Sequence, residues 1–97
     1  MQKFDVLIYT EEDYDIVDID VVVDDIKIKL YECSTENVAI SIEDLHSYNR
    51  EYTHKYNRVL YTCFTVYVAT YNDVCFDIHE FLQTSNFPDC VSVYVVV

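Results

Sequence analysis

Apolar and polar residues alternate along much of the chain, which is typical of strands that bury one face and expose the other. The alternation predicts a first strand at residues 3–10 and, after an acidic loop at 11–13, a second strand at 14–23. The chain is therefore expected to begin as β-structure.

The pair Asp24-Asp25 is interpreted as a two-residue hairpin turn that leads into a further strand. In this register the apolar residues of the two strands meet on one face, and Asp20 lies opposite Lys29 on the other. Part of the acidic face is thereby expected to be neutralised by lysine.

The spacing of apolar residues changes after a strand through Val38, Ile40 and Ile42. Leu45, Tyr48, Tyr52 and Tyr56 are spaced by 3, 4 and 4 residues, which predicts a helix at about 43–56. The other predicted elements are a turn at 34–37, a strand through Val38, Ile40 and Ile42, a central strand at 58–71, a turn at Asn72-Asp73 with a return strand at 74–76, a short helix capped by Asp77, and a strand at 91–97.

These elements predict a single α+β domain over residues 1–97. We expect an antiparallel or mixed sheet of five to seven strands with one or two helices packed on one face. The apolar strand at 91–97 must lie inside a sheet or inside an oligomer, because an exposed apolar edge aggregates. One hypothesis is therefore a non-enzymatic assembly protein that dimerises through this strand.

Charge restricts the partners. The chain has 18 acids, 6 bases and a net charge of −12, and no lysine-arginine cluster that could neutralise phosphates. Direct contact with nucleic acid or with a membrane surface is disfavoured. Glycine is absent, which excludes glycine-rich phosphate loops. No leader or membrane-spanning pattern is recognised, so a cytoplasmic location is expected.

The most informative segment is 11–25, where apolar residues interleave with acids and no base occurs. An ordered row of carboxylates resembles a phosphate backbone in charge, and it would attract proteins whose basic grooves hold nucleic acid. A solvated face that keeps the protein soluble is the alternative. The predicted partner-binding residues are Glu11, Glu12, Asp13, Asp15, Asp18, Asp20, Asp24 and Asp25.

No catalytic, metal or cofactor site is predicted. Cys75, Asp77 and His79 are close in sequence but straddle a strand-to-helix change, so a nucleophilic arrangement is disfavoured. The calcium-binding loop of an EF-hand needs a glycine at its sharp turn, and this chain has none. Four free, mostly buried thiols are expected, with one or two disulfides as the alternative. The cysteines are Cys33, Cys63, Cys75 and Cys90.

In size, low isoelectric point and the acidic segment 11–25, the chain resembles small acidic anti-defence proteins of phages and archaeal viruses. That class includes anti-CRISPR proteins, anti-restriction proteins and uracil-DNA glycosylase inhibitors. The resemblance implies a viral inhibitor in the host cytoplasm. It would bind a host nucleic-acid-binding protein, such as a CRISPR effector, through its basic groove.

Overall fold

The computed structural model describes residues 1–11, 16–45, 54–55 and 58–96. These residues form an α+β structure. In chain order the elements are β1 (Gln2–Thr10), α1 (Ile16–Glu32), β2 (Val38–Leu45), β3 (His54–Lys55), β4 (Arg58–Thr70), α2 (Ile78–Thr84) and β5 (Val91–Val96).

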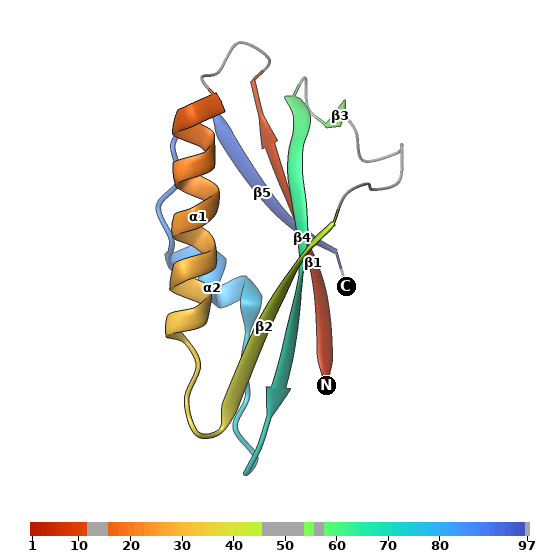
Figure 1. Ribbon diagram of the computed structural model, residues 1–97, viewed down its shortest axis with the longest axis vertical. Coiled ribbons are helices and arrows are strands. Elements are labelled where there is room, and N and C mark those ends of the chain that lie inside the picture. Colours follow the sequence, from red (N-terminus) through yellow and green to blue (C-terminus); the bar gives the residue numbers. More distant parts are fainter. Residues whose placement is uncertain (12–15, 46–53, 56–57, 97) are drawn as a thin grey trace.

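The strands form one antiparallel sheet in the order β2-β4-β1-β5 (Figure 1). The two-residue strand β3 pairs with the start of β4. The predicted antiparallel alternative is thus confirmed, whereas five to seven strands are not matched, since four described strands lie side by side. Residues 16–32, which were expected to supply strands, form a helix instead.

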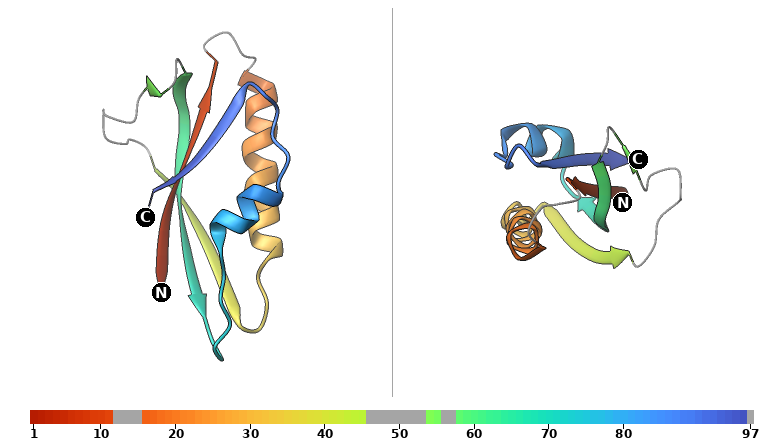
Figure 2. Two further views of the ribbon diagram at one scale, coloured as in Figure 1. Left: turned by 180° about the vertical axis from the view of Figure 1, so that it is seen from behind. Right: turned by 90° about the horizontal axis from the view of Figure 1, so that it is seen from above.

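Both helices pack on the same face of the sheet, as predicted (Figure 2). α1 contributes Ile19 and Leu30 to the core between the layers, and α2 contributes Ile78. The sheet contributes Val6 and Phe64 to the same core, and both are fully buried. Removing this apolar area from water is the main force that holds the two layers together.

The opposite face of the sheet carries a smaller apolar cluster. Leu7, Tyr9 and Cys63 are buried there. The rings of Tyr9 and Tyr94 meet edge to face, with centroids 5.4 Å apart. Hydrophobic side chains therefore occupy both faces of the central strands.

Most predicted strands are confirmed, at 3–10, through 38–42, at 58–71 and at 91–97, each within a few residues. The turn at Asn72-Asp73 is also confirmed: both residues have positive φ, 57° and 62°. Asparagine and aspartate tolerate this conformation best among residues other than glycine. Asp77 caps α2, because its carboxylate accepts hydrogen bonds from the amides of His79 and Glu80.

Several predicted strands and turns are wrong. The strand at 14–23 and the hairpin at Asp24-Asp25 are replaced by α1 from Ile16 onward, because one helical stripe of this segment fits the core. The return strand at 74–76 is absent, since the chain passes directly into α2.

The helix predicted at 43–56 is contradicted at both ends. Residues 43–45 continue β2, where Leu45 pairs with Cys63, and 54–55 form β3, where His54 pairs with Val59. The ladder hydrogen bonds available from β4 override the helical spacing there. Residues 46–53 and Tyr56 of the predicted helix, which include its three tyrosines, lie outside the described residues.

Candidate protein-binding face on α1

The acidic segment folds as a helix because its apolar residues also fit a helical stripe. Ile19, Val23, Ile26 and Leu30 are buried, at spacings of 4, 3 and 4 residues. This spacing places all four on one side of a helix. The same residues also satisfy the predicted hairpin, because a two-residue turn at 24–25 would place Ile19 and Val23 on the same face as Ile26 and Leu30. The 4-3-4 spacing was the signal for a helix, but the hairpin pattern competed with it.

The structure locates the predicted partner-binding acids in different ways. Glu11 is an exposed residue after β1, Asp18 lies in the first turn of α1, and Glu12, Asp13 and Asp15 lie outside the described residues. Asp20, Asp24 and Asp25 are exposed on α1. Asp20 and Asp24 lie one turn apart, about 6 Å along the axis, and Asp25 points about 100° further round the helix. The expected flat row is therefore replaced by carboxylates spread around the exposed side of α1.

Asp20 is fixed by the sheet. The Tyr61 hydroxyl donates a hydrogen bond to the Asp20 carboxylate. Tyr61 reaches the helix side of the sheet at a β-bulge, since Ile8 pairs with Thr62 and Tyr9 with Leu60. The hydrogen bond, with burial and the charge of Asp20, raises the pKa of Tyr61 to about 12. This contact holds Asp20 in a defined position.

Three of the bases are engaged with acids. Lys27 Nζ lies 2.6 Å from Asp44 on β2 and 5.3 Å from the centre of the Phe64 ring, which ties α1 to the sheet. Lys29 pairs with Asp25 at 3.0 Å, one turn apart on the exposed helix surface. No described base makes an ion pair with Asp24, so its charge is available to a partner.

Arg58 is engaged elsewhere. Its guanidinium lies 3.9 Å from Glu11 and donates hydrogen bonds to the Asp89 carbonyl oxygen and the Ser92 hydroxyl. Glu11, which directly follows β1, thus lies near Arg58 at the start of β4.

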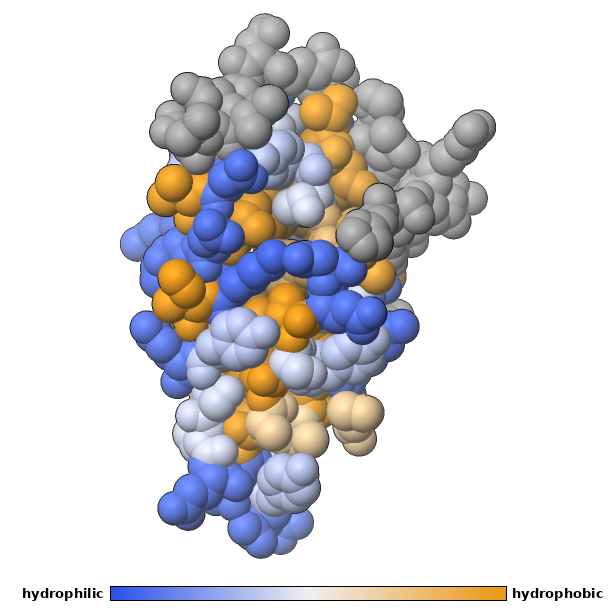
Figure 3. Space-filling view, viewed as in Figure 1, coloured by the Kyte–Doolittle hydropathy of each residue, from blue (hydrophilic) through white to orange (hydrophobic). Residues whose placement is uncertain are grey.

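Apolar side chains share the exposed side of α1 with the acids, which the sequence analysis did not anticipate. Val21, Ile28 and Tyr31 are 64%, 56% and 48% exposed. Figure 3 shows isolated apolar side chains among hydrophilic ones on this side of the molecule. We call this surface the α1 face and define it by Asp20, Val21, Asp24, Asp25, Ile28 and Tyr31.

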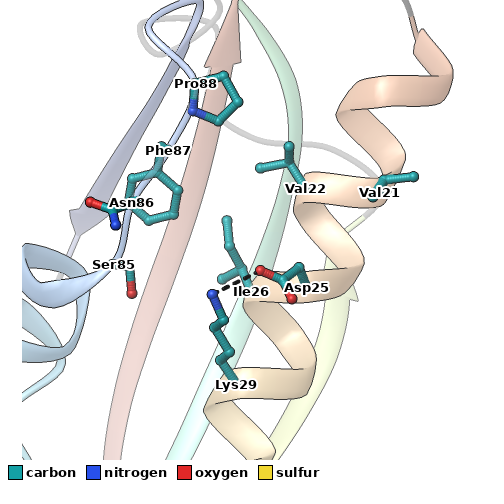
Figure 4. Close-up of a pocket in the computed structure, with 9 residues that line it drawn as sticks. All are labelled: Val21, Val22, Asp25, Ile26, Lys29, Ser85, Asn86, Phe87 and Pro88. Atoms are coloured by element: carbon teal, nitrogen blue, oxygen red, sulfur yellow. Dashed lines mark ion pairs between the residues drawn. The ribbon is translucent and has the colours of Figure 1, made fainter.

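A small hollow adjoins the α1 face, between α1 and the loop before β5 (Figure 4). Val22 and Ile26 of the helix point toward Phe87 across it, and the Asp25–Lys29 ion pair lies at its rim. Its volume of about 170 Å³ is below the usual ~300–1,000 Å³ of small-molecule sites. The hollow is of a size to receive one or two side chains of another protein.

No hydrogen bond joins the described side chains of Cys75, Asp77 and His79, and one oxygen of the Asp77 carboxylate instead accepts hydrogen bonds from the first amides of α2. Among the described residues, no three side chains of the metal-binding types are grouped closely enough to hold an ion. Neither described helix has the length and apolarity that crossing a membrane requires.

All four cysteines are free thiols, and only Cys63 is buried, so the expectation of mostly buried thiols is wrong. Burial, followed by the negative charge of Asp5, raises the pKa of the Cys63 thiol. Cys75 is exposed.

Comparison with known proteins gives no relative. No protein-family model matches the chain, and neither a curated protein nor a solved structure matches it. The function must therefore be inferred from the α1 face and the charge of the molecule.

Proposed function

We propose that this protein is a non-enzymatic viral inhibitor that acts in the host cytoplasm. It binds a basic nucleic-acid groove of a host defence protein, such as a CRISPR effector, through the α1 face. The observation that carries the proposal is the presence of exposed carboxylates and exposed apolar side chains on one side of a single packed helix.

The carboxylates supply attraction and take the place of phosphates. With a net charge of −12, the molecule is drawn toward a surface that is positive because it holds nucleic acid. Asp24 is the acid best placed for this role, because no described base neutralises it. The Tyr61 hydrogen bond orients Asp20 before binding, which lowers the entropy lost on association.

The exposed apolar residues of the α1 face contribute binding energy that does not depend on charge. Val21 and Ile28 lie two turns apart on the same side of α1, as do the anchors of helices that bind in grooves. Burying them stabilises a complex even where salt screens the carboxylates. The proposed target therefore has a groove with basic walls and an apolar floor.

The proposal is tested by competition on purified enzymes. Labelled duplex DNA or guide RNA is bound to each of a panel of CRISPR effectors and restriction enzymes, and its displacement by the protein is measured over a series of salt concentrations. We expect displacement from at least one enzyme, weakening as salt increases.

A matched pair of variants locates the surface. Asp24→Lys with Asp25→Lys is expected to weaken displacement at least about tenfold, since two favourable pairings of up to ~1 kcal/mol each become repulsive. Glu36→Lys with Glu80→Lys changes the net charge equally, at exposed positions away from the α1 face, and should retain displacement. Equal loss in both variants, or no displacement from any enzyme, contradicts the proposal.

A further inference from the structure

β5 lies at one edge of the sheet. It pairs with β1 from Asp5↔Val96 to Thr10↔Val91, and no other described strand lies beside it. A strand paired on one side directs backbone amides and carbonyls of alternate residues outward, where they can pair with another strand. The apolar strand predicted at 91–97 thus lies at an edge of the sheet of a single chain and not inside it.

The two edges of the sheet differ in protection. β2, at the opposite edge, carries the exposed charges of Glu43 and Asp44. β5 contains no charged residue and no proline. Edge charges, prolines and bulges are the usual means by which proteins prevent strands from pairing between molecules. β2 is protected in this way, whereas β5 is not.

An open hollow of about 470 Å³ lies beside β5. Its lining includes Val93, Tyr94 and Val95 of β5, with His79, Leu82, Gln83 and Phe87 on and after α2.

We propose that β5 pairs with β5 of a second copy of this chain, antiparallel and across a two-fold axis. Such pairing uses one surface twice, which is how most homodimers form. No like charges meet, because β5 is uncharged, whereas pairing through β2 would oppose acidic residues. This interface is separate from the α1 face and does not depend on the proposed function.

The geometry of the dimer follows from antiparallel pairing. The two sheets become one continuous sheet, and the two-fold axis is perpendicular to it. Both copies therefore carry their helices on the same side, and the two α1 faces point in a common direction. A target with two adjacent grooves would bind such a dimer with higher avidity than a monomer.

The experiment measures molecular mass by light scattering and sedimentation over a wide range of concentration. We expect a dimer for the unmodified protein. Val96→Lys places a charge on the β5 edge and is expected to halve the mass, with an unchanged circular dichroism spectrum. Ser41→Lys places the same charge on the β2 edge and should leave the dimer intact.

A monomer at every concentration, or a folded Val96→Lys protein that remains dimeric, overturns the proposal. Where Val96→Lys fails to fold, the unmodified protein decides the question. Isotope-filtered NMR on mixed labelled and unlabelled chains should show contacts between copies at 91–96. Contacts between copies elsewhere, or none at all, overturn it equally.

Discussion

At the scale of single residues, the contact between Tyr61 and Asp20 joins the proposed binding surface to the sheet. Asp20 is exposed on α1, and Tyr61 is the extra residue of a bulge in β4. Without the bulge, the hydroxyl would not reach the helix side of the sheet at this register. One irregularity in the ladder thereby fixes one carboxylate of the α1 face.

This contact predicts a late-titrating tyrosine. The pKa of Tyr61 is raised from 10.0 to about 12, chiefly by the hydrogen bond to Asp20. Because the folded value exceeds the unfolded one, the protonated phenol stabilises the fold below pH 10, and this contribution is lost as the pH rises from about 10 to about 12. Asp20→Asn should move the titration of Tyr61 back toward pH 10, as followed by ultraviolet absorbance.

The control for this titration is Tyr61→Phe, which should remove the tyrosinate transition at about pH 12 from the absorbance curve and leave the others. If Asp20→Asn leaves that transition where it was, the carboxylate is not the cause of the shift. In that case the orientation of Asp20 by Tyr61 also loses its support.

At the scale of elements, α1 is a helix built from residues that favour strands. Eight of its 17 residues are valine or isoleucine. Such β-branched residues lose side-chain freedom in a helix and are poor helix formers. α1 therefore depends on its buried stripe against the sheet, more than on intrinsic propensity, for its stability.

Two neighbouring valines separate the helix from the strand interpretation. In a strand, Val21 and Val23 would share a face and cost similar amounts to truncate. In α1, Val21 is 64% exposed and Val23 only 6%. Val23→Ala should therefore lower the free energy of unfolding by about 2 kcal/mol. Val21→Ala should be neutral or raise it by a few tenths of a kcal/mol, because alanine is the better helix former.

The measurement is urea unfolding of both variants beside the unmodified protein, at constant pH and salt. Comparable losses in the two variants would support a strand and contradict α1. A loss only in Val23→Ala would establish the helical register independently.

Alternation of apolar residues predicted four of the strands, and the Asp77 cap predicted α2, because these signals are local. α1 was missed because its valines satisfy two periods at once, and only the sheet decides between them. The acids could be found from sequence, but their surroundings could not. Tyr61 and Asp44 come to α1 from β4 and β2, and such contacts depend on long-range register.

At the scale of the whole molecule, the excess of acids acts on stability and on binding in opposite directions. The eighteen acids outnumber the six bases, so the excess negative charges repel one another in the folded state. Raising the ionic strength from about 0.01 M to about 0.15 M shortens the screening length from ~30 Å to ~8 Å. The melting temperature should therefore increase with sodium chloride, while the affinity for a basic groove should decrease.

Scanning calorimetry in sodium chloride gives the first quantity, and the competition assay gives the second. Choline chloride provides a control for effects specific to sodium. A melting temperature that stays constant or falls would show that repulsion among the acids does not limit stability.

β1 lies between β4 and β5, although it is made first. Thr10 pairs with Val59 on one side and with Val91 on the other. At ~5–20 residues per second, β1 leaves the ribosome on the order of ten seconds before β5 is complete. Until β4 is made β1 has neither neighbour, and until β5 is complete it has only one, so it is open to chaperones or to other nascent chains. The yield of folded protein should therefore depend on how quickly ribosomes translate the part of the message that encodes β4 and β5.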